Sequence, residues 1–395
     1  MSDQLPLVKK TLEKFGNPQL GFFAVHITGT NGKGSTGTIL QQILIESGLK
    51  VGYFSSPHVF HETERIKINN QPILEDRLAD YFQKIELEVG GADLGYFAKF
   101  WLAAALYFAE KAVDIAVVEV GVGGRLDPTN CVDADVVLLT NVSLDHQELL
   151  GDTLEAILLE KLALVKADKT LVASEVKPDL LNRIQAYVSD VSANLVVADH
   201  QLLIKNPQIS AAKTKFEFLD PMLDSEKLEL NMAGEHQLAN VTLAIKSATV
   251  LSNRFEEISS KSIVQGAAKA FLALRLEFLS KNGVTVLLDG AHNEGGVKAL
   301  AAYLSRFYLE TDFHLLFGVS KGRSPQDLIK PLLPFVKSSQ IVDGFYEATK
   351  SGLDFKTALD RKITELQNCT GKEQIVLVAG SLYLASEVRE ILTGS

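Results

Sequence analysis

Residues 28–36, with the sequence TGTNGKGST, have the residue types of a phosphate-binding loop. An apolar run, residues 22–27, precedes them and a helical pattern follows. The glycines let the backbone turn tightly and point its N–H groups at one oxyanion, and the start of a helix adds a positive dipole end. Lys33 can reach the β- and γ-phosphates of a nucleotide, while Ser35 or Thr36 can offer a hydroxyl to Mg²⁺.

This loop departs from the standard P-loop pattern at two positions. Ile27 stands where the pattern requires glycine, and Gly34 separates Lys33 from Ser35. A plain glycine turn is therefore the alternative interpretation, although the strand before the loop and the helix after it favour phosphate binding. The residues of the loop that we expect to contact ATP are Gly29, Thr30, Asn31, Gly32, Lys33, Gly34, Ser35 and Thr36.

Side chains that can bind ligands follow three other apolar runs. Glu119 closes one run, His146 follows the next run along the chain, and Asp289 ends a run in the C-terminal third. Open α/β sheets bind ligands outside the carboxyl ends of their strands. We therefore expect these three side chains to face ligand-binding clefts.

Short apolar runs without alternation recur along the chain and are separated by helical patterns such as residues 100–111 and 296–307. Such runs are typical of parallel strands buried on both faces, in strand–helix–strand units. The runs are residues 22–27, 51–54, 115–120, 136–140, 170–173, 284–288, 313–317 and 375–378. The predicted fold class is α/β, with parallel sheets.

The length of 395 residues predicts two domains. A new series of strands and helices begins after residues 270–281, so we place the N-terminal domain at residues 1–273 and the C-terminal domain at residues 274–395. Residues 178–230 mix polar and β-branched segments. They are compatible with a subsidiary sheet or with an excursion from the first domain.

The composition excludes several classes of protein. A net charge of −10 argues against a nucleic-acid partner, because a negative field repels phosphate backbones. Cys131 and Cys369 have no spacing typical of a disulfide framework or a zinc site. The N-terminal sequence MSDQLPLVKK lacks the apolar run of a signal peptide, and no segment resembles a membrane span. We expect a cytoplasmic monomer without membrane attachment.

The loop TGTNGKGS resembles the phosphate loop of the Mur ligase superfamily, which joins amino acids to carboxylates at the expense of ATP. Further segments, in order along nearly the whole chain, resemble folylpolyglutamate synthase and its bifunctional relative dihydrofolate synthase. They are SSPH at 55–58, ERI at 64–66, EVGVGGRLDPTN at 119–130, DH at 145–146, LGDTL at 150–154, EK at 160–161, GEHQ at 234–237, DGAHN at 289–293 and AGSLYL at 379–384.

This resemblance implies the two-domain architecture of Mur ligases, with a P-loop-type parallel sheet in an N-terminal ATPase domain and a smaller Rossmann-like α/β C-terminal domain. It also implies an activity. ATP would phosphorylate the glutamyl carboxylate of a folate, and the amine of L-glutamate would displace phosphate from the acyl phosphate. The substrates would be ATP, L-glutamate and folate or dihydropteroate. The resemblance leaves open whether dihydropteroate is converted as well as tetrahydrofolate.

The resemblance also implies a metal site and catalytic residues. Ser35, Glu119 and His146 would bind Mg²⁺, and Lys161 would carry a CO₂-derived carbamate that binds a second Mg²⁺. On residue type alone, His146 is an unusual ligand for Mg²⁺, and Lys161 would lie on a solvated helix face. The residues implied for catalysis are Lys33, His146 and Lys161.

Contacts to nucleotide and substrates are implied in both halves of the chain. Asn240 would contact adenine, Arg275 the ATP phosphates, and Asp289 the nucleotide or glutamate. Ordinary alternatives are helix capping just before Asn240, a surface ion pair for Arg275, and an ion pair between Arg125 and Asp127. The residues implied on the substrate side are Ser56, His58, Arg65, Arg125, His292 and Ser381.

The sequence departs from this family at two places. Ala98 stands where relatives often carry an acid, on the expected folate side, and the sequence after Lys161 is Leu-Ala instead of Ala-Gly. These departures are the support for one alternative, a non-catalytic, ATP-binding regulatory protein. The other alternative is another Mur-type amino-acid ligase, against which the GGRLD and DGAHN segments argue.

Overall fold

The computed structural model describes residues 4–175, 177–223, 226–319, 324–342, 354–367, 369 and 372–394. They form two compact units. The first unit comprises Met1–Gln208, Lys215–Asn231 and Gln237–Phe271. The second comprises Ile209–Thr214, Met232–His236 and Leu272–Ser395, so it includes two short segments that precede its main stretch.

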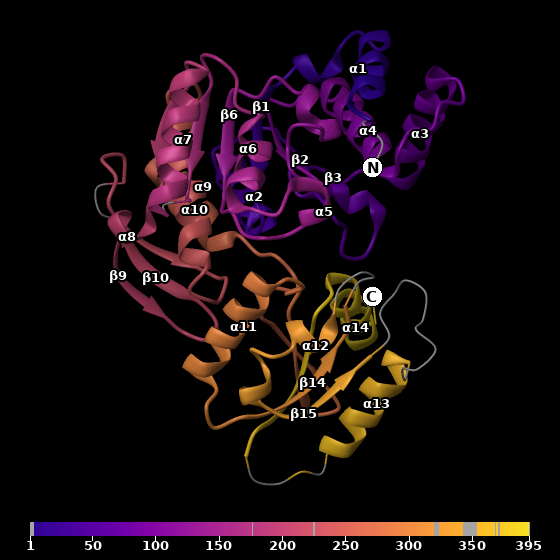
Figure 1. The fold of residues 1–395 in the computed structure, drawn as a ribbon, viewed down its shortest axis with the longest axis vertical. Helices are drawn as coiled ribbons and strands as arrows, with labels where there is room; N and C mark the ends of the chain where they lie inside the picture. The colour runs from indigo at the N-terminus through magenta and orange to yellow at the C-terminus, as the bar shows by residue number, and fades with distance from the viewer. Residues whose placement is uncertain are drawn as a thin grey trace. The chain divides into compact units, whose positions relative to one another are not determined.

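Within the described residues, the first unit is built around an eight-stranded sheet in the order β4-β3-β2-β5-β1-β6-β7-β8 (Figure 1). From β2 to β8 in this order, neighbouring strands run parallel, while β3 and β4 pair antiparallel at one edge. The strands are β1 Phe23–Thr28, β2 Val51–Phe54, β3 Ile66–Ile68, β4 Gln71–Pro72, β5 Ile115–Glu119, β6 Val136–Leu139, β7 Thr170–Ala173 and β8 Asn194–Val197. Every residue of β2, β5 and β6 is buried, which explains the absence of alternating polar residues in their sequences.

Helices cover this sheet. Helix α2 packs against α9 and α10, and α4 packs against α3 and α1. The helices of this unit are α1 Leu5–Lys14, α2 Lys33–Glu46, α3 Glu75–Val89, α4 Tyr96–Glu110, α5 Gln147–Leu150, α6 Leu154–Leu162, α7 Pro178–Asp190, α8 His200–Leu203, α9 Gln237–Leu251 and α10 Ser260–Lys269.

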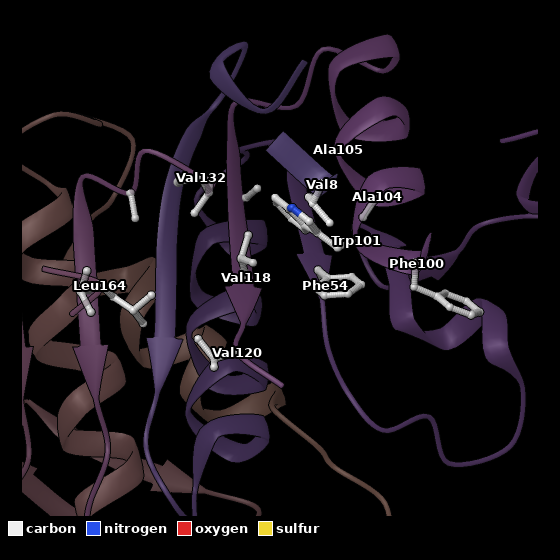
Figure 2. Close-up of a cluster of buried hydrophobic side chains, with 14 of the residues drawn as sticks. Val8, Phe54, Phe100, Trp101, Ala104, Ala105, Val118, Val120, Val132 and Leu164 are labelled. Carbon is white, nitrogen blue, oxygen red and sulfur yellow. The ribbon is translucent and has the colours of Figure 1, made fainter. Parts of the chain in front are cut away.

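A large hydrophobic core lies between α4 and the sheet (Figure 2). Trp101 and Phe100 of α4 are fully buried, and the Trp101 ring lies 5.5 Å from the ring of Phe54 on β2. Val118 of β5 belongs to the same core. These contacts fix the carboxyl ends of β2 and β5, from which candidate site residues project.

Residues 178–230 contain α7, β8, α8 and a separate three-stranded sheet in the order β11-β10-β9. Its strands are β9 Ile204–Ile209, β10 Thr214–Phe218 and β11 Lys227–Leu230. Of the two interpretations, the subsidiary sheet is therefore the correct one, although β8 joins the main sheet.

The second unit contains a five-stranded sheet in the order β12-β13-β16-β14-β15 within the described residues. Strand β12 is antiparallel to β13, and the other neighbours are parallel. The strands are β12 Glu277–Lys281, β13 Val284–Leu288, β14 Asp312–Phe317, β15 Val336–Ile341 and β16 Gln374–Ala379. The helices are α11 Glu294–Phe307, α12 Pro325–Leu328, α13 Phe355–Leu366 and α14 Leu382–Thr393.

The α/β fold class predicted from the sequence is confirmed, with a larger parallel-sheet unit and a smaller sheet unit. All eight predicted runs are strands, each within one residue at either end. The division at residue 273 stays a prediction. No helix in the described part of the chain is long and apolar enough to cross a membrane.

Candidate active site

The predicted phosphate loop connects β1 to α2. Gly32 has a φ of 87° and precedes the first turn of α2, where no side chain caps the backbone N–H groups. These N–H groups, with the helix dipole behind them, are suited to bind an oxyanion. The Lys33 ammonium folds back over the loop and donates hydrogen bonds to the carbonyl oxygens of Gly29 at 3.0 Å and Thr30 at 3.3 Å.

A segment after β6, residues 140–143, holds the phosphate loop in place. The Thr140 hydroxyl donates to the Asn31 carbonyl at 2.6 Å, and the N–H of Thr30 donates to the Asn141 carbonyl at 2.9 Å. The N–H of Asn31 donates to Oδ1 of Asn141 at 3.0 Å, and the N–H of Ser143 donates to the Thr30 hydroxyl at 3.1 Å. The amides of Thr30 and Asn31 are therefore engaged within the protein, which leaves the amides of the helix start for phosphate.

Our sequence interpretation missed Thr140, Asn141 and Ser143. Their position was the available signal, because Thr140 ends a predicted strand at its carboxyl end, and Asn141 and Ser143 follow it as the phosphate loop follows β1.

We expect Thr140→Val to raise the KM for ATP about 3- to 10-fold, the equivalent of one lost hydrogen bond. Valine keeps the shape of threonine but leaves the Asn31 carbonyl without its donor. Steady-state kinetics with varied ATP would measure the change, and Thr140→Ser, which keeps the hydroxyl, should stay within about twofold of the wild type. An equal change in both variants would contradict the role of this hydrogen bond.

Two lysines, one from the phosphate loop and one from α6, interact electrostatically. Lys161 is only 3% exposed, and burial lowers the pKa of its ammonium to about 7, with a further contribution from the charge of Lys33. The carboxylate of Asp145 acts in the opposite direction. The solvated-face interpretation of Lys161 is therefore wrong, and an amine with this pKa is substantially neutral at pH 7.

Oxygen donors and an imidazole lie along the same edge of the sheet. Glu119 ends β5 directly beside Ile27 of β1, and its carboxylate is 4% exposed. Ser35 in the first turn of α2 is also 4% exposed. His146, with a φ of 50°, lies in the exposed loop before α5.

The side chains at this edge of the sheet include donors suited to a magnesium ion. Across the described ranges, no three or more His, Cys, Asp or Glu side chains cluster as a metal site, so such a site needs other donors. Ser35 and Glu119 supply the oxygen atoms that Mg²⁺ prefers. The buried hydroxyl of Thr36, next to Ser35, has no hydrogen-bond partner in the described part of the chain. The residues present therefore fit Mg²⁺ if an additional oxygen donor is provided.

The turn after β5, residues 121–124, is named here the glycine turn. The Asp127 carboxylate accepts hydrogen bonds from the N–H groups of Gly121 at 3.0 Å and Val122 at 3.1 Å. Arg125 pairs with Glu160 of α6 at 2.8 Å, and not with Asp127 as in the ion pair considered from the sequence. The role of Asp127 in closing this turn was missed from the sequence, although the residue lies in a motif that we singled out.

The predicted substrate-side residues of this unit follow β2. The Arg65 side chain is buried, and its guanidinium lies 5.2 Å from the ring centres of both Tyr96 and Phe100. It donates from Nε to Nδ1 of His58 at 2.9 Å. Burial, followed by the charge of Arg65, lowers the pKa of His58. Arg65 and His58 are thus brought together, with Ser56 two residues before His58.

Asn240 lies against the phosphate loop. Its side chain is 6% exposed and donates from Nδ2 to Oε1 of Gln237 at 2.8 Å. A Cβ atom on Gly32 would be 2.3 Å from Oδ1 of Asn240, so this oxygen faces the loop.

The predicted residues of the second unit gather at the carboxyl ends of β13 and β16. The buried Asp289 accepts hydrogen bonds from the N–H groups of Leu276 at 3.0 Å and Ala291 at 2.9 Å, and the Arg275 guanidinium interacts with it electrostatically. His292 contacts the Gly290 carbonyl through Nδ1 at 2.8 Å. Ser381 caps α14 by accepting the N–H of Leu384 at 3.4 Å.

Family models match both parts of the chain. The model of the Mur ligase middle domain matches residues 27–248, more than half of the chain, and that of the dihydrofolate synthetase C-terminal domain matches residues 273–350.

Curated and solved proteins are similar over nearly the full length. The chain is 30% identical over 404 residues to the dihydrofolate synthase/folylpolyglutamate synthase of Bacillus subtilis, covering 98% of this chain and 94% of that protein. It is 30% identical over 405 residues to the folylpolyglutamate synthase (FPGS) of Lacticaseibacillus casei, covering 97% and 93%. A solved FPGS–AMPPCP–folate complex is 28% identical, with a TM-score of 0.86 over 100% of this chain and 96% of that chain. The chain therefore belongs to the Mur ligase family and, within it, to the folylpolyglutamate and dihydrofolate synthases.

Proposed function

We propose that this chain uses ATP to join L-glutamate to the glutamyl carboxylate of tetrahydrofolate or another folate. The observation that carries the proposal is the burial of Lys161 near enough to phosphate-loop Lys33 for the charge of Lys33 to lower the pKa of Lys161 further, which makes Lys161 readily deprotonated. The choice of acceptor is supported by relatives: the B. subtilis relative is named for both synthase activities, and a similar solved FPGS holds folate and AMPPCP.

The proposed reaction has two steps. A carboxylate oxygen of the folate attacks the γ-phosphorus of ATP, an oxygen–phosphorus bond forms, and ADP leaves with the electrons of the broken bond. The amine of glutamate then attacks the acyl carbon, loses a proton, and expels phosphate as the amide forms. Catalysis of such steps depends on positioning and charge stabilisation. The phosphate loop, held by hydrogen bonds from residues 140–143, is suited to position the phosphates, and the Lys33 ammonium is suited to stabilise their charge.

Lys161 is proposed to react with CO₂, so that a nitrogen–carbon bond forms, the nitrogen loses a proton, and a carbamate anion replaces the amine. Only the neutral amine has the lone pair for this reaction, and a pKa of about 7 makes that form abundant at neutral pH. The positive charge of Lys33, which opposes an ammonium at Lys161, would favour an anion there.

Ser35, Glu119 and His146 would hold one Mg²⁺, and the Lys161 carbamate would provide an oxygen donor for a second ion. When bound, Mg²⁺ neutralises charge on the transferred phosphoryl group. The chain's own residues would orient ATP. Loop residues 29–36 would contact the phosphates, and Asn240 would contact the edge of the adenine ring.

The remaining assignments are parts of the same proposal. We place the N-terminal domain at residues 1–273 and the C-terminal domain at residues 274–395, in a monomer. Arg275 and Asp289 would contact ATP. The residues proposed to contact folate or glutamate are Ser56, His58, Arg65, Arg125, His292 and Ser381.

A second activity, joining glutamate to dihydropteroate, is favoured by the double name of the B. subtilis relative. It would use the same chemistry, because dihydropteroate also presents a carboxylate for phosphorylation.

Phosphate release and product mass would test the function. The purified protein would receive ATP, Mg²⁺ and L-glutamate with tetrahydrofolate, dihydropteroate or no acceptor. We expect release with tetrahydrofolate and a product heavier by one glutamyl unit. Release with dihydropteroate would add the second activity. ATP binding without acceptor-dependent release would refute the proposal and favour another Mur-type ligase or a regulatory protein.

A further inference from the structure

A buried histidine, His26, lies in the middle of β1 and has no part in the reaction proposed above. Its side chain is 1% exposed, and it pairs in register with Val118 of β5, one position before Glu119 and its partner Ile27. Burial, with a smaller contribution from Lys166, lowers the pKa of His26 to about 3, so the imidazole is neutral at physiological pH. Burying a polar ring in the sheet costs free energy unless it is hydrogen-bonded.

His26 is the first member of a buried chain of hydrogen bonds, named here the Asp127 network: His26, Thr129 and Asp127. Nε2 of His26 lies 2.7 Å from the Thr129 hydroxyl, and that hydroxyl donates to Oδ1 of Asp127 at 2.5 Å. Oδ2 of Asp127 accepts the N–H groups of Gly121 and Val122 in the glycine turn. All three side chains of the network are at most 5% exposed.

The donors and acceptors define one direction along the network. Asp127 receives four hydrogen bonds, two from the glycine turn and two from the N–H and hydroxyl of Thr129. These four donors favour its ionised form, although burial raises its pKa. The Thr129 hydroxyl has a single hydrogen and donates it to Asp127. In its contact with His26 the hydroxyl oxygen is therefore the acceptor, so His26 must carry its proton on Nε2.

The glycine turn that the network holds lies between two parts of the proposed site. It follows Glu119 by one residue, and the N–H of Arg125 just after it donates to the Glu160 carbonyl at 3.0 Å, next to Lys161. A Cβ atom at Gly124 would be 2.7 Å from the same carbonyl, so the turn packs directly on α6. Residues 140–143, which are not members of the network, hold the centre of the phosphate loop at Thr30 and Asn31. The first residue of that loop does contact the turn, because the Thr28 hydroxyl donates to the Gly123 carbonyl at 2.8 Å.

We propose that His26 and Thr129 are positioning residues that, through Asp127, fix the glycine turn between Glu119 and Lys161. The inference rests on the proposed function for its kinetic consequence. The network acts on the groups that stabilise phosphoryl transfer, while the hydrogen bonds from residues 140–143 to Thr30 and Asn31 of the phosphate loop stay in place. Loss of the network therefore lowers kcat and spares the KM for ATP.

Matched pairs of variants separate this role from simple packing. Thr129→Val keeps the shape but removes the hydroxyl, whereas Thr129→Ser keeps it. His26→Met removes the donor, whereas His26→Gln offers an amide N–H in a similar place. We expect Thr129→Val and His26→Met to lower kcat about 10- to 100-fold with the KM for ATP within about twofold, because misplaced groups slow chemistry more than binding. Thr129→Ser and His26→Gln should recover most of the rate.

Two measurements that do not depend on activity complete the test. Hydrogen exchange followed by mass spectrometry should show faster exchange across residues 119–127 in Thr129→Val and His26→Met, but not in the rescuing variants. A nitrogen–proton correlation spectrum of histidine-labelled protein should place the proton of wild-type His26 on Nε2 at pH 7, with its signal identified by loss in His26→Gln.

The outcomes are distinguishable from failure of the proposed function. A wild-type protein that ligates no folate refutes the function, while the exchange and tautomer results still decide whether the network holds the turn. Unchanged exchange and kcat in Thr129→Val, a proton on Nδ1, or equal losses in the valine and serine variants would each overturn the positioning role.

Discussion

Replacing Lys161 by methionine is expected to lower the rate of glutamate ligation at least about 100-fold while raising the stability of the protein, since a carbamate ligand is lost together with a buried cation. Methionine has a similar length and volume but cannot react with CO₂. In the wild type, activity should fall in CO₂-depleted buffer and return on addition of bicarbonate. The variant should show no such response.

The gain in stability follows from the lowered pKa of Lys161. The pKa is about 7 in the folded protein against a model value of 10.5, so folding disfavours the protonated form. The resulting destabilisation, about 1.4 kcal/mol for each pKa unit, is complete below pH 7 and vanishes as the pH rises through 10.5. We therefore expect the excess Tm of Lys161→Met, measured without CO₂, to be largest near pH 6 and to shrink between pH 7 and 10.

A lysine at the surface provides the control for this experiment. Lys298 on α11 has an exposed side chain that pairs with Glu294, and Lys298→Met should leave both activity and Tm nearly unchanged. Ligation by Lys161→Met at the wild-type rate would contradict the carbamate proposal. A lower Tm for Lys161→Met at pH 6 would contradict the lowered pKa.

The second large effect is expected at Gly32. Gly32→Ala would place a Cβ atom 2.3 Å from Oδ1 of the buried Asn240, in a residue whose φ of 87° already disfavours alanine. Either the loop or the Asn240 side chain must shift to relieve this overlap. Asn240 is buried and hydrogen-bonded to Gln237, so we expect the loop to move and to displace the N–H groups at the start of α2. We expect ATP affinity to fall at least about 100-fold, as measured by direct titration of the nucleotide.

A variant of Gly48, which follows the other end of α2, serves as a control that has the backbone strain but not the steric overlap. It has a nearly identical φ of 86°, but a Cβ atom there meets nothing within 4 Å. Gly48→Ala should therefore cost about 1–2 kcal/mol of stability from the left-handed backbone alone and leave ATP affinity unchanged. Similar losses of ATP affinity in both variants would show that strain in α2, and not contact with Asn240, governs the loop.

The continuous apolar runs predicted the central strands because a strand buried on both faces needs apolar residues at every position. The same reasoning missed β15, Val336–Ile341, whose sequence VKSSQI alternates between partly buried and exposed residues at the edge of its sheet. It also missed β3 and β4, which are too short to carry a pattern.

The candidate site was predictable where function requires a special local sequence, as in the phosphate loop. Lys161 was harder, because its neighbour Glu160 is partly exposed and pairs with Arg125, as on an ordinary helix surface. The buried positions of α6 are Ile157, Leu158, Lys161 and Leu162, so helical spacing alone places Lys161 on the inner face. The hydrogen bonds from residues 140–143 and the contact of His26 with Thr129 join segments distant in sequence, and no local pattern encodes them.

The second unit includes Ile209–Thr214 and Met232–His236, which precede its main stretch in the chain. The unit therefore cannot be cut out of the protein as one fragment that begins at Leu272. Ala233 belongs to the hydrophobic core of that unit, and the hydroxyl of the buried Tyr303 donates to the Ala211 carbonyl at 2.7 Å. A recombinant fragment that begins at Leu272 would lack both, leaving a void and a buried hydroxyl without its acceptor. A fragment of the second unit that is prepared for complementation or for segmental isotope labelling should therefore include residues 209–236 in the same polypeptide as the residues after Leu272.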